Sequence, residues 1–357
     1  MANRYKSADL IEFAQTLLQK GGLGPKPAQT VAETLVEGDL LGKTTHGLQL
    51  LPQYLQSLVD GKMTKSGRPK VLKQSTTTLL LDANYLPGPW VIRRALDWAM
   101  PRAKKHGVAT VSIRDCHHIA CLQTYLQSVT DQGLAVILLC SDPANSTVAP
   151  AGGLEGVYSP NPIAAGFPTS GEPILIDTIT SSVSNAQNTR SYKAGQKSPF
   201  TALQTAQGRP TNDPAVLFAK PPGSILPLGG IELGHKGFAM AIIVEALANA
   251  LCGSGRAKKP DRWGASVFLQ VIDPAFFGGL AEFRRETGYF AETCRKSKPR
   301  SGQRAVRVPG EKPLALRREQ LAQGVDLYPT IRSALEPWAE KFRVKFPQPM
   351  KPAIERE

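Results

Sequence analysis

The spacing of apolar residues divides the chain into a helical beginning and a mixed centre. Apolar positions recur three and four residues apart in LIEFAQTLL and AETLVEGDLLG, which is the period of amphipathic helices, and GGLG with Pro25 and Pro27 separates the two. After Gly61 come short runs typical of strands, namely VLKQ, TTTLLLDA, ATVSIRD and LAVILLC. Helical stretches near residues 91–105 and 120–131 alternate with them. The pattern predicts an α/β core.

The second half of the chain begins with a loop-rich segment and then returns to helix and strand patterns. From Ser141 to Pro227 it is rich in Pro, Gly, Asn and Thr, which predicts long loops around a few strands such as PILIDT, and loops of that length commonly carry functional sites. An apolar helix is expected at about 236–251, after a glycine-bracketed turn. The strand ASVFLQVID then ends at Asp273-Pro274, a helix-start signal, and the last fifth is helical again.

Composition favours a cytoplasmic globular protein. The 357 residues are 41% hydrophobic, enough for a substantial core, but no run of about 18 to 20 apolar residues predicts a membrane span. The segment MANRYKSADL is too polar for a signal peptide. The five cysteines are odd in number, scattered and mostly in apolar surroundings, so we expect reduced core residues rather than disulfides or a zinc site.

The formal net charge is +14, and basic residues gather late in the chain, with eleven from Arg284 to Arg318. A solvated surface explains such a run, and so does attraction of phosphate-bearing cofactors and carboxylate substrates. No helix-turn-helix, zinc finger or RNA-binding motif accompanies the charge, so we predict no nucleic-acid partner.

Four of the five histidines lie in three short polar segments. His46 is in KTTHGLQLLPQYL, His117 and His118 are in RDCHHIACLQ, and His235 is in GIELGHKGFAM. Histidine exchanges protons near neutral pH, so the clustering indicates acid-base chemistry, although each could instead be a hydrogen-bonded structural residue. Adjacent His117 and His118 diverge, and no carboxylate stands at ligand spacing, so no metal site is predicted.

Three further residues are candidates for cofactor contacts. Lys236 is expected at the start of the apolar helix, where a helix N-terminus favours anions; an ordinary solvated lysine is the alternative. Arg307 in RVPGEK offers a planar fork for phosphate, or is a surface arginine. Asp177, at the end of PILIDT, suits an N-cap, a turn or a ribose ligand. The Rossmann fingerprint GxGxxG is absent between strand and helix.

Seven segments occur in an order that resembles one family. They are GDLLGKTTHGLQLLPQYLQSLVDGKM, RDCHHIACLQTYL, SDPANSTVAPAGG, NPIAAGFP, ILIDTITSS, LPLGGIELGHKGFAMAIIVEAL and VRVPGE. Their order, over residues 5 to 345, is similar to that of the malate/L-lactate dehydrogenase-like oxidoreductases. That family includes ureidoglycolate and sulfolactate dehydrogenases and the reductases of Δ1-piperideine-2-carboxylate and Δ1-pyrroline-2-carboxylate.

The resemblance implies a non-Rossmann nicotinamide-binding α/β fold with a large, mostly antiparallel sheet flanked by helices. An N-terminal helical segment (1–65) is then expected to pack with residues 312–345. Residues 66–311 would form the nicotinamide-binding sheet domain with its substrate loops, and 312–357 the C-terminal helices and tail. It also implies a homodimer with the active site near the subunit interface.

The resemblance also implies roles for individual residues. Thr45 and His46 match a serine-histidine pair and His118 matches the histidine of an HHFG-like loop, which makes these the catalytic candidates. Ser141 matches a substrate-side position in some members, and Tyr54 is a further substrate candidate. The expected cofactor contacts are His118, Ile119, Ala120, Cys121, Leu122, Asp177, Thr178, Ile179, His235, Lys236, Arg307, Val308, Pro309 and Gly310.

Departures from the family pattern fall on the substrate side. Leu50 stands where many members carry a carboxylate-binding arginine, and Arg190 in NAQNTRSYKAG is the candidate replacement, with a surface arginine as the alternative. GTNP is replaced by SPNP at residues 159–162, and two glycines are replaced by Ala120 and Ala186. Each added methyl group could narrow a site that needs close backbone approach, which implies altered substrate preference or a weakened enzyme.

The function hypothesis is hydride transfer between nicotinamide C4 and C2 of a small 2-hydroxy or 2-oxo acid, with His46 or His118 handling the proton. Reduction of cyclic 2-imino acids is the alternative within enzymes. A catalytically silent nucleotide- or polyanion-binding protein is the alternative of another class. The sequence leaves NAD and NADP equally open.

Overall fold

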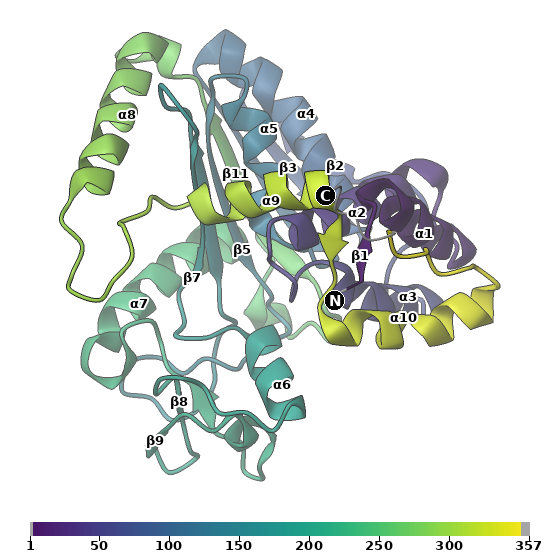
Figure 1. Cartoon of the computed structure of the whole chain (residues 1–357). Helices are drawn as coiled ribbons and strands as arrows, with labels where there is room; N and C mark the ends of the chain where they lie inside the picture. Colours follow the sequence, from purple (N-terminus) through teal and green to yellow (C-terminus); the bar gives the residue numbers. More distant parts are fainter. Residues whose placement is uncertain (1–2, 351–357) are drawn as a thin grey trace, which may run out of the picture.

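A seven-stranded sheet forms the centre of the molecule (Figure 1). The computed structural model describes residues 3–350. The strand order is β2-β3-β4-β11-β5-β6-β7, and every neighbouring pair is antiparallel except β3 and β4. The strands are β2 (Lys70–Gln74), β3 (Thr78–Asp82), β4 (Val108–Cys116), β5 (Ala135–Ser141), β6 (Pro162–Phe167), β7 (Ile174–Ile179) and β11 (Ala265–Ile272). The predicted large, mostly antiparallel sheet is confirmed.

Helix α4 (Gly88–His106) makes the crossover that the parallel pair β3 and β4 requires. Its apolar stripe, which includes Val91, Ile92 and Leu96, is buried in the main core against the sheet. The crossover confirms the helix predicted near residues 91–105. Strand β11 arrives from much later in the chain and inserts between β4 and β5, with Ala265 paired to Cys116.

The first and last helices pack together beside the sheet (Figure 1). Helices α1 (Ser7–Lys20), α2 (Pro25–Leu40), α3 (Leu51–Val59) and α10 (Pro329–Phe342) share one buried apolar cluster, and β1 (Arg4–Tyr5) pairs with β12 (Val325–Asp326). Helix α9 (Glu311–Gln323) joins them through Arg317 Nε, 2.6 Å from Glu37 Oε1. The terminal helices therefore contact each other, while the division of the chain near residues 65 and 311 stays a prediction.

The loop-rich region between β5 and α7 folds around a small second sheet. Its strand order is β10-β8-β9, with β8 (Leu203–Gln204), β9 (Pro210–Thr211) and β10 (Ser224–Ile225). Helix α6 (Asn185–Lys193) lies in the same region, and its N-cap Ser184 accepts a hydrogen bond from the Gln187 amide. Short 3₁₀ turns complete the chain, namely η1 (Leu48–Leu50), η3 (Pro214–Phe218), η5 (Arg256–Lys258) and η6 (Pro274–Phe276).

Helix α7 starts earlier than its sequence pattern indicated. It spans Gly230–Val244 and continues as a π-helical turn over Glu245–Ala250, so the expected start near residue 236 was wrong. Gly229 and Gly230 both adopt positive φ, at 99° and 67°, so the glycine pair turns the chain directly into the helix. His235 and Lys236 therefore lie inside α7 rather than in a turn at its N-terminus.

The helix expected at residues 120–131 is instead two short pieces, η2 (Leu122–Tyr125) and α5 (Gln127–Thr130). Local groups compete for the hydrogen bonds that a continuous helix would use. The Asp177 carboxylate accepts from the Gln123 amide, and the Thr124 hydroxyl donates to the Cys121 carbonyl. Helix α8 (Leu280–Lys296) completes the fold, and no helix within residues 3–350 is long and apolar enough to cross a bilayer.

Candidate active site

His46 and His118 meet between the helical unit and the sheet. His46 lies in the loop after α2, His118 lies in the loop after β4, and their ring centroids are 5.9 Å apart with planes 23° from parallel. The His46 loop turns back tightly onto α2, because a Cβ on Gly47 would lie 2.4 Å from Asp39 Oδ1. Asp39 Oδ2 also accepts a 2.7 Å bond from the Leu48 amide. The last turn of α2 thus holds His46 in place.

The Thr45 hydroxyl lies beside the His46 ring. Thr45 Oγ1 is 2.9 Å from His46 Nδ1, so a donating hydroxyl would leave the ring proton on Nε2. Burial is the main cause that lowers the pKa of His46. The negative charge of Asp177 raises this pKa, while the positive charges of Lys43 and Arg190 lower it. The ring keeps a partly exposed edge and is therefore a neutral, reachable imidazole near pH 7.

The orientation of His118 is fixed from two sides. The Ala120 amide donates to His118 Nδ1 at 3.2 Å, which makes Nδ1 an acceptor and places the proton of the neutral ring on Nε2. Tyr54 Oη lies 3.0 Å from the same nitrogen and donates to the His118 carbonyl at 2.9 Å. Burial holds the pKa of His118 well below its usual range, and His46 and His117 add to the effect.

His117 has a different environment from its neighbour. It is fully buried, and neither ring nitrogen has a hydrogen-bond partner among residues 3–350. Burial alone lowers its pKa to about 3. His117 is thus a neutral packing residue, whereas His118 presents Nε2 to the site.

Arg190 reaches the same place from α6. Its Nη1 donates to Thr44 Oγ1 at 2.9 Å, and its guanidinium carbon lies 3.7 Å from the centre of the Tyr328 ring. The Nη2 atom is buried without a hydrogen-bond partner in the part of the chain that the structure describes. By contrast, Leu50 is buried in the apolar core of the terminal helices. Arg190 thus keeps a free guanidinium donor beside the His46 loop, and its role as the carboxylate ligand stays a prediction.

Asp177 connects β7 with the segment that follows His118. Its Oδ2 accepts the Gln123 amide at 3.2 Å and lies 3.5 Å from Cys121 Sγ. The predicted segment from His118 to Leu122 and the stretch from Asp177 to Ile179 are therefore neighbours. Ala120, which replaces a family glycine, adopts a φ of 58°, a conformation that favours glycine.

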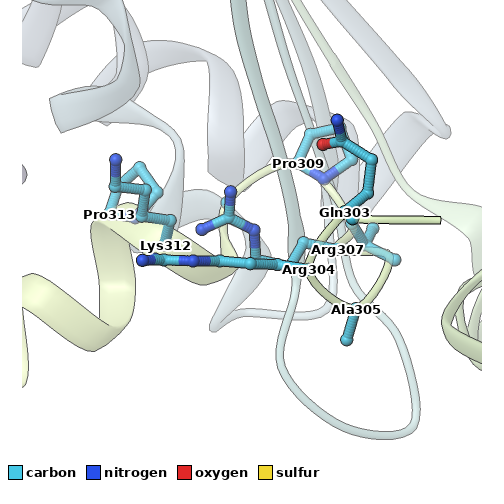
Figure 2. A pocket seen from close by; sticks show the side chains of 10 residues that line it. Gln303, Arg304, Ala305, Arg307, Pro309, Lys312 and Pro313 are labelled. Atoms are coloured by element: carbon cyan, nitrogen blue, oxygen red, sulfur yellow. The ribbon is translucent and has the colours of Figure 1, made fainter. Parts of the chain in front are cut away.

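The loop before α9 forms a basic pocket at the other end of β7. The hollow of about 660 Å³ is lined by ten residues between Gly302 and Pro313, and Figure 2 shows Arg304, Arg307 and Lys312 among them. The Leu175 amide donates to the Pro309 carbonyl at 3.1 Å, which places the loop two residues from Asp177, or about 7 Å along the strand. Within residues 3–350, none of the three cations forms an ion pair.

Three predicted contacts lie apart from this arrangement. Ser141 is buried in a polar network, where its hydroxyl donates to Glu245 Oε1 at 2.9 Å and accepts from Arg256 at 3.1 Å. His235 and Lys236 are exposed on α7. No hydrogen bond within residues 3–350 joins these three residues to His46 or His118, and their expected roles stay predictions.

Sequence reasoning missed one aromatic residue of the site. Trp263, just before β11, stacks on His118 with ring centroids 4.4 Å apart and planes at 24°. It also meets His117 and Tyr54 edge to face, at 5.1 and 5.7 Å. The only signal in the sequence was an aromatic residue beside Gly264 at a strand start, which is too common to indicate a site.

The chain has relatives of known family over nearly its whole length. The sequence pattern of the family described as malate/L-lactate dehydrogenase matches residues 5–336. The malate dehydrogenase of Pyrococcus abyssi is 28% identical over 96% of both chains. The L-lactate dehydrogenase of Cupriavidus necator is 30% identical, over 94% of this chain and 97% of the relative.

A solved structure shares the fold. The Δ1-piperideine-2-carboxylate reductase of Pseudomonas syringae superposes with a TM-score of 0.82 at 26% identity, covering 94% of this chain and 99% of that one. Fold and sequence together define an α/β oxidoreductase of the non-Rossmann type. The chain belongs to the malate/L-lactate dehydrogenase family, as the order of its motifs predicted.

Proposed function

We propose that this chain is an NAD(P)-dependent oxidoreductase that interconverts a small 2-hydroxy acid and its 2-oxo acid. The observation that carries the proposal is the convergence of two neutral imidazoles, His46 and His118, with the unpartnered guanidinium nitrogen of Arg190. Asp177 and the basic loop extend the site along β7. Its family membership supports the same reaction class.

Arg190 would hold the substrate carboxylate. Its position is fixed by Thr44 and Tyr328, so the remaining donor Nη2 can bind an anion without reorganising. The carboxylate would thus supply the missing partner of a buried donor. The C2 oxygen would then lie toward the histidine pair, where an Nε2–H donor can polarise it and transfer a proton.

The basic pocket and the Asp177 segment fit a nicotinamide dinucleotide. Arg304, Arg307 and Lys312 would hold phosphate, while the segment from His118 to Leu122 would lie along the cofactor toward the histidines. When bound, the cofactor supplies or accepts the hydride. Among the expected contacts, Thr178, Ile179, Val308, Pro309 and Gly310 fall on this path, and His235 and Lys236 would reach it only from α7.

Reduction of a cyclic 2-imino acid is the second candidate. The depressed pKa values of His46 and His118 favour it, because an iminium nitrogen already carries the proton that a ketone must take from the protein. The similarity to a piperideine-2-carboxylate reductase points the same way. Both reactions use the same carboxylate contact.

The test is an absorbance screen of NADH and NADPH against pyruvate, oxaloacetate and piperideine-2-carboxylate. Oxidation of a cofactor with one acid would establish the activity and choose between ketone and imine. The variant Arg190→Ala should raise the KM of the acid more than tenfold, about the loss of one charge-assisted bond. Cofactor binding without turnover of any acid would instead support the silent binding protein.

A further inference from the structure

Trp263 lies opposite His118 because of how β11 pairs with β4. Ala265 pairs with Cys116 in an antiparallel ladder, and two residues beyond that pair in each direction are Trp263 and His118. Gly264 keeps the two chains close, since a Cβ there would lie 2.6 Å from the Cys116 carbonyl oxygen. The sheet register therefore brings the indole over the imidazole.

Hydrogen bonds of Arg256 also hold the N-terminal end of the loop that carries Trp263. Arg256 Nε lies 3.0 and 3.1 Å from the two Glu245 oxygens, and Arg256 Nη2 donates to the Asp142 carbonyl at 3.2 Å. Glu245 begins the π-helical turn, which also presents Asn249 to the same carboxylate at 2.6 Å. The loop between Arg256 and β11 is thus held at both ends.

The Trp263 indole covers one face of the His118 ring. The indole plane is 24° from the imidazole plane, with the centroids 4.4 Å apart, so one face of the imidazole is covered. The Ala120 amide donates to Nδ1, and the Tyr54 hydroxyl lies 3.0 Å from the same nitrogen while its proton goes to the His118 carbonyl. A ring flip would break the hydrogen bond from the Ala120 amide to Nδ1, and tilting would break the stack on Trp263. In this orientation Nε2 is the ring nitrogen that remains available to a substrate.

On the basis of the proposed function, we propose that Trp263 is a positioning residue that holds His118 for proton transfer and shields one face of its ring. Aromatic stacking stabilises the contact beyond burial alone and so favours one ring orientation. The groups that surround His118 are Tyr54 from α3, His46 from the loop after α2, and neighbouring His117. Trp263 covers one face of the His118 ring with an uncharged indole.

The kinetic test compares Trp263→Phe with Trp263→Leu. Phenylalanine keeps an aromatic face, so kcat should stay close to that of the wild type. Leucine removes the stack, so kcat should fall about tenfold or more, while the KM of the cofactor is unchanged. Without the indole, water reaches His118, so its pKa should rise toward the usual value for histidine. The acid limb of the kcat profile should therefore move to higher pH. Trp338→Phe, on α10, is the matched control and should change none of these values.

A second measurement needs no turnover. Diethylpyrocarbonate acylates accessible neutral imidazoles, and peptide mass spectrometry gives the rate for each histidine, with exposed His106 as internal reference. His118 should react several-fold faster in Trp263→Leu than in the wild type or Trp263→Phe. An unchanged His118 rate would overturn the proposal, and so would an unchanged kcat in an active enzyme. If the wild type turns over no acid, the proposed function fails, and the acylation rates alone decide whether Trp263 shields His118.

Discussion

At the scale of single residues, two neighbouring histidines have opposite environments. His118 has hydrogen bonds and a partly exposed edge, whereas buried His117 has neither. The sequence pattern HH could not distinguish them, because the difference arises from Tyr54 and Trp263, which lie far away in the chain. His46 and His118 were predicted through family resemblance, Arg190 as a replacement for the arginine missing at Leu50, and Tyr54 as a further substrate candidate. The structure brings those four side chains together. Trp263 has no local pattern that predicts its stacking.

Replacing His46 tests the catalytic assignment. His46→Gln keeps a hydrogen-bonding side chain but cannot exchange a proton near neutral pH, so kcat should fall by roughly 100- to 10,000-fold. Cofactor affinity, measured by fluorescence titration, should be unchanged. His106→Gln, at the exposed end of α4, is the control. A kcat equal to that of the wild type would remove His46 from the mechanism.

His117 should make the protein sensitive to acid. Its pKa is about 3 in the folded state and near 6.5 when unfolded, so the unfolded state binds more protons between these values. Stability is therefore complete above pH 6.5 and falls as the pH is lowered, by roughly 2 kcal/mol at pH 5 from this residue.

The variant His117→Leu should lose that part of the acid sensitivity. Urea unfolding at pH 7 and pH 5 gives the free energy of unfolding for both proteins. Asp39, whose pKa burial raises to about 7, contributes equally to both and cancels in the comparison. Equal losses of stability in variant and wild type would contradict the prediction.

At the scale of elements, the sequence pattern predicted six of the seven strands of the large sheet, missing β6, and it predicted α1, α2 and α4. The pattern failed where side chains compete with the backbone, as Asp177 and Thr124 do within residues 120–131. It also misplaced the start of α7, because a glycine pair indicates a turn as readily as a helix start. The π-helical turn at Glu245 depends on contacts with Arg256 and Asn161, which no local period encodes.

The loop before α9 should decide cofactor affinity. Arg307→Ala should raise the cofactor KM about tenfold, equal to about 1.4 kcal/mol of lost phosphate contact. Arg300→Ala changes the same charge outside the pocket lining and should leave KM unchanged. A larger effect on NADPH than on NADH would place the 2′-phosphate in the pocket, and equal effects would place the pyrophosphate there. No effect on either would exclude the pocket from cofactor binding.

At the scale of the whole molecule, helices α7 and α8 expose large apolar side chains. Ile242 and Ile243 on α7 are 53% and 54% exposed, and Tyr289 and Phe290 on α8 are 71% and 66% exposed. Figure 1 shows both helices on the side of the sheet away from the terminal helices. Apolar surface of this kind marks interaction sites, which supports the predicted homodimer through this side.

Sedimentation velocity tests the dimer. The wild type should sediment as a dimer, and the double variant Ile242→Glu with Ile243→Glu should sediment as a folded monomer, because paired carboxylates would be buried across the interface. Val71→Glu, on the edge strand β2, is a control at a comparably exposed apolar position. A wild-type monomer at micromolar concentration would contradict the proposed assembly.

The pairing of the first strand with the last has a consequence for how the protein is made. Helices α1 to α3 are synthesised before the strands of the large sheet, but their partners β12 and α10 are synthesised after them. The sheet therefore has most of its strands available while the helical unit still lacks part of its core. Since α2 holds the His46 loop and Tyr328 holds Arg190, the site takes its final shape only after Tyr328 has been synthesised. A nascent chain would thus build its scaffold before it could act on a substrate.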